Sequence, residues 1–377
     1  MSVLGVTNAT MEDGNATVTV IDSDTFTYPN TGADASSSGG TVTDLSVPLN
    51  NRAVIVTNER HAMMIGVAGN PYRVGWSSRE DYTDWNFSSV VNTAGYLDLK
   101  SETPLFTLGA VREGILVWSE NKVFLGRYIG QPFIYGFDAI AEASIYSPYS
   151  FAEFDGRCVF MDRSGFRIYE GGAIKQLPCQ LNDYIFSSID KTFGPRVAHA
   201  SANGLFNEVW FFFPSDGNAE CNKYVIWNYA ENWWSMGSLE RSAMFPAGAG
   251  EYPLMMGAVT GAYRLWQHED GWLGSGKARS IFAESAVLNL PGAEATLQAN
   301  QGILSVGGGY DKVTLTAYTR MTPNGAQRTF GPYSPRSDGY VDIRITGRDV
   351  RLRVDEAVAG DWSIGRMRFK VAAGGKR

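Results

Sequence analysis

Histidine, cysteine and charged side chains are scarce in this chain of 377 residues. There are three histidines and three cysteines, and Asp, Glu, Lys and Arg together make up 19% of the sequence. Zinc sites use Cys and His in closely spaced pairs, and no such pair occurs, so we expect neither a metal centre nor another cofactor. Cys158, Cys179 and Cys221 are odd in number and widely spaced, which favours free thiols over a disulfide framework.

Segments typical of membrane insertion and export are also missing. No stretch approaches the roughly 18 apolar residues that a membrane-spanning helix needs, so we expect no membrane insertion. The N-terminal sequence MSVLGVTNATMEDGNATV lacks the basic start and apolar centre of a secretory signal. These features predict a chain that is made in a reducing cytosol.

Glycine and aromatic residues are abundant instead. The chain contains 42 Gly, and Phe, Trp and Tyr make up 13% of it, while 44% of all residues are hydrophobic. This hydrophobic content is enough for a sizeable core, and aromatic strands joined by glycine turns are typical of β proteins. The composition therefore predicts an all-β fold.

Charge is unevenly distributed along the chain. The net charge is −7, which argues against a protein that grips nucleic acid with its whole surface. Residues 1–50 carry six acids and no Lys or Arg, and we interpret them as an acidic, polar N-terminal arm or small β element. Residues 341–377 carry nine Lys or Arg against five Asp or Glu, which gives a local +4.

Five hairpins follow the arm. Each consists of two short apolar runs joined by a polar or glycine-containing turn: 53–56 with 62–67, 115–118 with 123–125, 158–161 with 166–169, 209–213 with 224–227, and 254–258 with 263–266. Their spacing is close to the roughly 40–50 residues of a propeller blade, so residues 51–275 are predicted to form a β-propeller-like core of five to six blades. Further strands are expected near 72–76 and 96–99, and short helices only at 138–146 and 181–189.

The pattern changes in residues 276–377. Apolar and polar residues alternate in several runs, with glycine and proline between them: 280–290, 302–306, 312–319, 339–346, 350–354 and 367–371. Strict alternation is typical of strands with one buried face, so this part predicts a small β-sandwich-like domain with a basic C-terminal tail.

Catalytic motifs are weak. Five carboxylates lie near the ends of predicted strands, where a propeller glycosidase could place its general acid and nucleophile: Asp81, Asp84, Asp138, Asp155 and Asp162. No sialidase-type Asp box is present, and turn-forming or solvated carboxylates are the preferred interpretation. The three histidines, His61, His199 and His268, have no Gly-x-Ser-x-Gly motif to serve. We therefore expect no enzyme activity.

Tryptophans and arginines form two further groups. The tryptophans at 76, 85, 118, 233 and 234 could stack sugars or bases, but filling the gaps between blades is the preferred role. Six arginines recur at β spacing near the C-terminus: Arg344, Arg348, Arg351, Arg353, Arg366 and Arg368. They are either a solvated face or a docking surface for an acidic partner subunit, and we take them as the candidate subunit or adaptor interface.

Three segments together carry a resemblance to a known family. They are residues 73–85 (RVGWSSREDYTDW), the stretch 201–234 with LFNEVW, FPS and WNYAENW, and 361–368 (DWSIGRMR) before the final GGKR. In residue pattern and in their order along the chain they resemble the tail nozzle, or tail hub, proteins of short-tailed bacteriophages, over roughly residues 50–377. Residues 1–50 are not covered by this resemblance.

The resemblance implies an assembly component of the virion tail, put together in the host cytoplasm. Such subunits form a homo-oligomeric, hexameric ring below the portal and its head-tail adaptor. The ring extends the DNA channel, serves DNA retention and ejection, and carries tail fibres, spikes or a needle. Double-stranded DNA would pass through without specific binding, which suits an acidic body. The alternative is a propeller-type carbohydrate-binding or glycan-cleaving protein.

Overall fold

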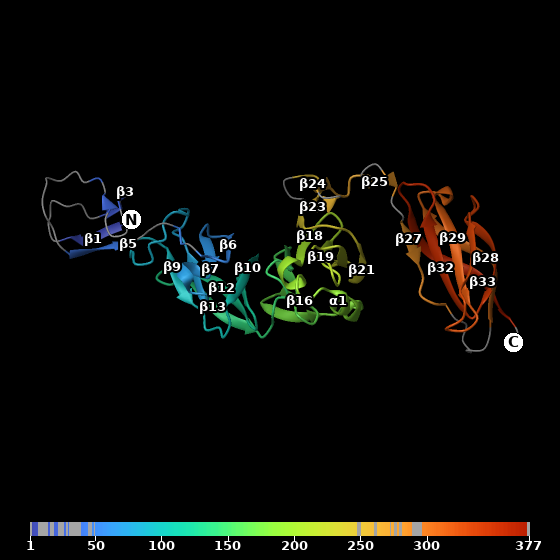
Figure 1. Ribbon diagram of the computed structural model, residues 1–377, viewed down its shortest axis with the longest axis horizontal. Coiled ribbons are helices and arrows are strands. Elements are labelled where there is room, and N and C mark those ends of the chain that lie inside the picture. The colour runs from blue at the N-terminus through green and yellow to red at the C-terminus, as the bar shows by residue number, and fades with distance from the viewer. Residues whose placement is uncertain are drawn as a thin grey trace. The chain divides into compact units, whose positions relative to one another are not determined.

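The computed structural model divides the chain into two compact units, Met1–His268 and Glu269–Arg377. It describes residues 50–246, 250–259, 262–271, 273–274, 277–278, 281–288 and 296–374, with short segments before residue 50. Antiparallel strands dominate both units (Figure 1), so the all-β prediction is confirmed. The sequence placed the boundary between residues 275 and 276, and the structure places it after His268. Among the described residues, no helix is long and apolar enough to cross a membrane.

Most of the N-terminal arm lies outside the described residues. The described segments are strands: β1 (Ser2–Val6), β2 (Gly14–Asn15) and β5 (Gly39–Thr43) pair in the order β2-β1-β5, and β3 (Thr19–Val20) pairs with β4 (Phe26–Thr27).

Four antiparallel sheets of four strands follow the arm, each with its strands in sequence order. The first has β6 (Ala53–Val56), β7 (Ala62–Ile65), β8 (Arg73–Trp76) and β9 (Gly95–Asp98). The second has β10 (Leu105–Val111), β11 (Gly114–Ser119), β12 (Val123–Gly130) and β13 (Ile134–Ala141). The third has β14 (Phe151–Phe154), β15 (Arg157–Met161), β16 (Phe166–Glu170) and β17 (Ala173–Leu177). The fourth has β18 (His199–Asn203), β19 (Glu208–Phe213), β20 (Lys223–Asn228) and β21 (Trp233–Ser238).

A fifth sheet of three strands ends the series, with β22 (Ala243–Phe245), β23 (Leu254–Val259) and β24 (Ala262–Gln267). The first strands of successive sheets lie next to one another, from β6 to β10, β14, β18 and β22. Meandering sheets that meet along their first strands are the arrangement of propeller blades. All five predicted hairpins are present in these sheets, and the propeller-like prediction is confirmed.

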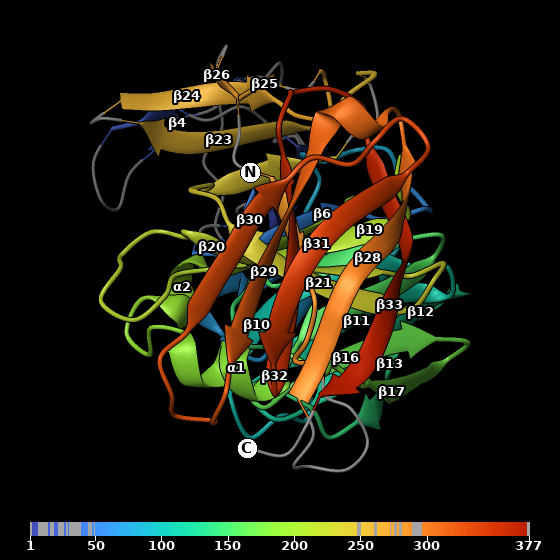
Figure 2. The same cartoon turned by 90° about the vertical axis from the view of Figure 1, so that its right-hand side faces the viewer.

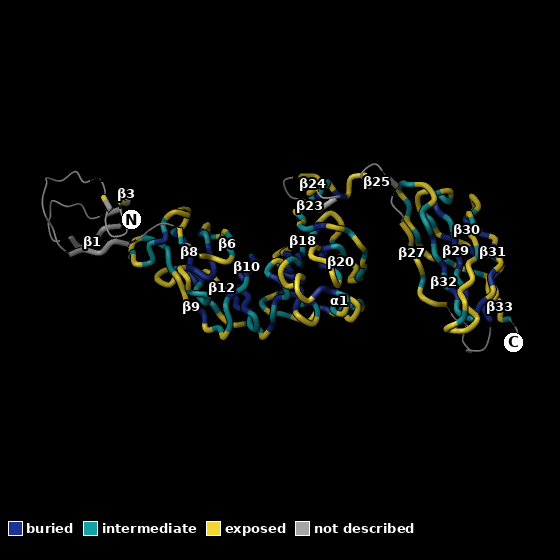
Figure 3. The backbone as a smooth tube through the Cα atoms, in the orientation of Figure 1, coloured by how far each residue is buried: buried dark blue, intermediate teal, exposed yellow. Residues whose placement is uncertain are grey.

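Alternation along each strand explains how the sheets stack. In β11, Ile115 and Val117 belong to the core between the first and second sheets, whereas Leu116 and Trp118 belong to the core between the second and third. Successive side chains of a strand point to opposite faces, so one run of apolar residues supplies two cores. Buried residues therefore concentrate inside the series of sheets (Figure 3).

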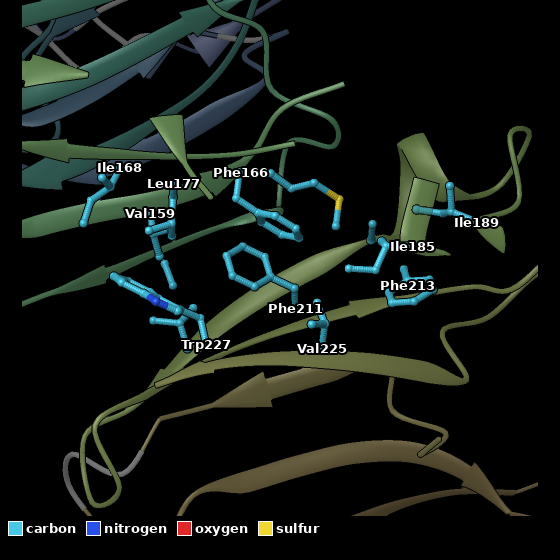
Figure 4. Close-up of a cluster of buried hydrophobic side chains, with 14 of the residues drawn as sticks. Val159, Phe166, Ile168, Leu177, Ile185, Ile189, Phe211, Phe213, Val225 and Trp227 are labelled. Atoms are coloured by element: carbon cyan, nitrogen blue, oxygen red, sulfur yellow. The ribbon is translucent and has the colours of Figure 1, made fainter. Parts of the chain in front are cut away.

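The largest of these cores lies between the third and fourth sheets. Phe166, Val159 and Leu177 from the third sheet meet Phe211 and Trp227 from the fourth (Figure 4). The rings of Phe166 and Phe211 are in edge contact, with centroids 4.9 Å apart. Such aromatic contacts add stability beyond the area that they bury.

Three of the five tryptophans fill gaps between sheets, as the preferred interpretation predicted. Trp118 is fully buried against Phe151 of the next sheet, and Trp76 lies in the core between the first two sheets. Trp85 packs under the first sheet, and Trp234 packs against the core between the third and fourth. Two of the five do not fill such a gap: Trp85 packs with residues 62–87 of its own sheet region, and Trp233 is 39% exposed at a sheet edge.

One of the two predicted helices is present, and the prediction of the other is wrong. Helix α1 (Asn182–Ser188) lies within the predicted range 181–189, and a short helix α2 (Gly194–Val197) follows it. Residues 138–141 are instead the last part of strand β13, which pairs with β12. The backbone hydrogen bonds that decide this come from a partner strand, which a local pattern does not contain.

Gly114 fixes the turn between β10 and β11. Its φ is +146°, and a Cβ added there would overlap the carbonyl oxygen of Gly126 on β12. Only glycine combines this backbone conformation with so close an approach of two strands.

The C-terminal unit is a two-sheet sandwich (Figures 1 and 2). One sheet, here the β32 sheet, has the order β27-β32-β29-β30, with β27 (Phe282–Glu284), β32 (Asp349–Glu356), β29 (Val313–Arg320) and β30 (Arg328–Tyr333). The other, the β28 sheet, has the order β31-β28-β33, with β31 (Tyr340–Gly347), β28 (Thr296–Gly307) and β33 (Ser363–Gly374). Leu304, Leu315, Ile343 and Leu352 are among the side chains that fill the space between the sheets, which confirms the sandwich-like prediction. A ribbon of β25 (Leu273–Gly274) and β26 (Lys277–Ala278) precedes the sandwich, and the turns η1 (Val67–Gly69) and η2 (Tyr310–Lys312) complete the elements.

Candidate functional site

The six arginines of the predicted interface do not share one surface. Arg351 and Arg353 lie on β32, whereas Arg344 lies on β31 and Arg366 and Arg368 lie on β33, in the other sheet. The sixth, at position 348, lies in the connection between β31 and β32, where its backbone N–H donates to a carbonyl of β29. The set therefore divides into groups with different surroundings.

Arg351 and Arg353 bind within their own chain. The guanidinium of Arg351 lies 2.8 Å from a carboxylate oxygen of Glu284 on the edge strand β27. That of Arg353 donates to Asp355 over 2.7 Å and lies 3.8 Å from the ring centroid of Phe282, also on β27. The Arg351–Glu284 ion pair and the stacking of Arg353 on Phe282 join β32 to β27, so these two arginines stabilise the edge of the sandwich.

Three of the remaining arginines, together with a lysine on β33, form a surface that we call the basic face: Arg344, Arg366, Arg368 and Lys370. On β33 these side chains are exposed, while Met367 and Phe369 between them pack into the core. Arg344 is exposed between the buried Ile343 and Ile345 of β31. Within the described part of the chain, no ion pair or hydrogen bond involves the four charged groups. Asp342 lies on the same side of the sheet and pairs with Arg336, so the four unpaired basic groups leave this side with a net positive charge. Such a surface is available to an acidic partner.

The five carboxylates near strand ends are engaged locally. Asp81 accepts hydrogen bonds from the backbone and hydroxyl of Thr83, and these bonds lower the pKa of the carboxyl. A general acid needs the opposite shift. The other four also have close partners: Asp84 with Asn92, Asp138 with Arg127, Asp155 with Arg157, and Asp162 with Arg167. They act as turn and ion-pair residues, which agrees with the preferred interpretation.

All three histidines make a hydrogen bond through a ring nitrogen. His61 is fully buried between the first and second sheets, with Nδ1 3.0 Å from the Tyr135 hydroxyl and Nε2 3.2 Å from Thr93. The same Tyr135 hydroxyl also contacts Thr57 at 2.8 Å. Burial lowers the pKa of His61 and raises that of Tyr135, so both are neutral near pH 7. His268 accepts a hydrogen bond from Arg241 over 3.0 Å.

His199 differs from the other two and lines a pocket of about 510 Å³, which we call the first-strand pocket. Its Nδ1 lies 3.2 Å from the carbonyl oxygen of Val197, and its buried Nε2 has no partner among the described residues. Burial lowers the pKa of this ring, so it is neutral near pH 7. Tyr149 and Phe151 line the same pocket, beside the charged Arg196. Such a mixture of aromatic and polar groups suits a small polar ligand.

The sequence did not reveal the uncovered surface of the fifth sheet. We call it the apolar end face, and it consists of Phe245, Met256, Tyr263 and Leu265, which are between 44% and 65% exposed. Met256 pairs with Leu265 across β23 and β24, so these side chains share one side of the sheet. The predicted hairpin 254–266 contained the pattern, but alternation alone does not tell which face a neighbour covers.

Comparison with solved structures gives distant likenesses. No protein-family model and no curated protein matches the chain. An exo-β-1,3-galactanase from Phanerochaete chrysosporium is 9% identical over 85% of this chain and 95% of its own, with a TM-score of 0.31. A glycoside hydrolase is 7% identical over 86% and 99%, at 0.28. The extracellular domain of a one-component system from B. thetaiotaomicron is 6% identical over 78% and 52%, at 0.29. Likenesses at these TM-scores carry no argument about function.

Proposed function

We propose that this chain is a non-enzymatic structural protein of a phage virion, a subunit of a ring-shaped tail nozzle. In this role it extends the DNA channel below the portal and adaptor and serves DNA retention and ejection. The observation that carries the proposal is the unpaired basic face of Arg344, Arg366, Arg368 and Lys370 on an otherwise acidic chain. The resemblance of residues 73–85, 201–234 and 361–368 to tail nozzle proteins supports it.

The charge distribution fits both the passage of DNA and the binding of an acidic neighbouring protein. Residues 1–340 carry a net −11, since the whole chain has −7 and residues 341–377 have +4. An acidic wall binds DNA phosphates weakly, which lets DNA slide through a channel. A basic face on the C-terminal sandwich binds an acidic neighbour, and this attraction weakens as salt screens it.

Electron microscopy of virions that contain the labelled chain tests the proposal. We expect a six-fold ring directly below the portal and adaptor, with the sandwich of each subunit against a neighbouring protein. The proposal is wrong if the chain is absent from virions, or if it is a monomer that cleaves glycans.

Charge reversal tests the basic face itself. The double variant Arg366→Glu and Arg368→Glu is expected to dock at least tenfold more weakly, with an unchanged circular dichroism spectrum, because both side chains are exposed and unpaired. Arg328→Glu, on the other sheet of the same unit, is the matched control and should dock normally. Equal docking of the two variants would show that the basic face is only a solvated surface.

The first-strand pocket favours a second candidate function, a carbohydrate-binding protein. Aromatic rings such as Tyr149 and Phe151 stack on sugars, and the unpartnered Nε2 of His199 leaves a buried polar atom to be satisfied. Saturation-transfer NMR with methyl β-D-glucoside and methyl β-D-galactoside tests it. Binding that is lost in Tyr149→Ala and kept in Tyr82→Ala, another exposed tyrosine, would establish this function; no signal with either sugar would exclude these ligands.

A further inference from the structure

The apolar end face is the last surface of a regular stack. Each of the four inner junctions buries one face of a sheet against the next sheet, and these junctions hold the hydrophobic cores of the propeller-like region. The fifth sheet uses one side in this way, because Met255 packs with Trp210 and Phe212 of the fourth sheet. Its other side carries the apolar end face, which no described sheet covers.

The composition of this face matches a buried junction and not a solvated surface. Phe245, Met256, Tyr263 and Leu265 are all large, and none is charged. Aromatic and methionine side chains are enriched at the centres of protein interfaces, where charged residues are depleted. Scattered apolar residues are normal on a surface, but a contiguous apolar sheet face marks an interaction site.

A complementary surface lies at the opposite end of the series. On β6 of the first sheet, Ala53 and Ile55 face the core shared with the second sheet. Val54 and Val56 alternate with them on the reverse side and are 57% and 69% exposed. On this reverse side Trp85 and Phe87 cover Met64 of β7, whereas Val54 and Val56 of β6 remain exposed. The part of the first sheet that is open to another sheet therefore lies along β6.

We propose that the apolar end face binds the first sheet of a second copy of this chain, around Val54 and Val56. This contact rests on the proposed ring, and it supplies the lateral junction between neighbouring subunits. It repeats between molecules the same sheet-on-sheet packing that the chain uses four times internally. Because the two surfaces are different, the contact is head-to-tail, and head-to-tail contacts close into rings when the rotation between copies allows it.

Sedimentation of the full-length chain over a range of concentrations tests the contact. The wild type is expected to associate, and Leu265→Glu is expected to weaken association by at least tenfold, because it places a charge in an apolar junction. Arg264→Glu introduces the same side chain one residue earlier on β24, on the opposite side of the sheet, and should associate like the wild type. Since both positions are exposed, both variants should keep the wild-type melting temperature. A wild type that stays monomeric, or equal association of both variants, would overturn the proposal.

Cysteine cross-linking tests the identity of the two surfaces. Mixed chains carrying Val56→Cys and Leu265→Cys should form a disulfide-linked dimer on oxidation, which requires Cα atoms about 4.4–6.8 Å apart. Val90→Cys, which is more exposed than Val56, replaces it in the control and should give no such dimer with Leu265→Cys. A disulfide within a single chain carrying both substitutions, without dimers, would show that the chain covers its own end face and would overturn the proposal.

The two proposals fail in different ways. If virions contain the ring but the cross-link is missing, this contact is wrong and the nozzle function stands. If the purified chain forms the cross-linked contact but is absent from virions, the nozzle function is wrong and the contact stands.

Discussion

Replacement of Trp118 by alanine measures how strongly the sheets of the propeller-like region depend on one another. Trp118 is fully buried, lies 5.2 Å from the ring centroid of Phe151 and 5.5 Å from that of Phe160, and so connects the second sheet to the third. Removal of a buried tryptophan costs about 3–5 kcal/mol, because apolar contacts are lost and a cavity remains. We expect the free energy of unfolding to fall by that amount in urea titrations followed by circular dichroism.

Two further variants separate packing from hydrogen bonding at this position. The indole N–H of Trp118 has no partner among the described residues, and a buried donor left unpaired costs about 1–3 kcal/mol. Trp118→Phe keeps an aromatic ring and removes that donor, so the free energy of unfolding should fall by less than about 1.5 kcal/mol. Trp233→Ala makes the same truncation at a site that is 39% exposed, and it should cost about 1 kcal/mol or less.

The comparison between the two alanine variants decides the outcome. If Trp118→Ala and Trp233→Ala are equally destabilised, the second and third sheets do not share a core as described. Hydrogen exchange locates the effect, because Trp118→Ala should expose amides of β11 and β15 before those of the C-terminal sandwich.

Further predictions concern three local features. Gly114→Ala should lower stability by at least about 1–3 kcal/mol in the same urea assay, because its φ of +146° and the nearby Gly126 carbonyl leave no room for a Cβ. Backbone N–H groups of the α2 turn lower the pKa of Asp190, so its stabilising effect is present above the unfolded pKa of about 3.9 and is lost as pH falls through the lower folded value. Asp190→Asn should therefore flatten the loss of stability between pH 5 and pH 3, and an unchanged slope would contradict this. Burial raises the pKa of the Cys221 thiol to about 12 and that of Cys179 to about 11, so both should react with thiol reagents at pH 8 more slowly in the folded chain than after unfolding.

Features that depend on neighbours in the chain were predictable. The five hairpins were located because turn residues and alternation lie within a few positions of one another. The predicted helix at 138–146 failed because β13 takes its hydrogen bonds from β12. Strand β30 (Arg328–Tyr333) was missed, since its glycine and proline conceal the strand pattern in an edge strand.

The candidate interface shows the same limit. Spacing placed six arginines on strands, but it did not separate Arg353, which binds Asp355 and stacks on Phe282, from Arg368, which is exposed and unpaired. The strands β32 and β33 are neighbours in sequence and belong to different sheets, and that assignment depends on pairing with β29 and β28.

The sequence by itself determined the class of fold, the hairpins, the shortage of metal ligands and the uneven distribution of charge along the chain. Each of these follows from composition or from local spacing. Only the tertiary structure decided which apolar faces are covered. Met255 and Met256 are adjacent and chemically identical, yet one is buried against the fourth sheet and the other lies on the apolar end face. Burial is set by what a sheet packs against, and that contact joins residues far apart in the chain.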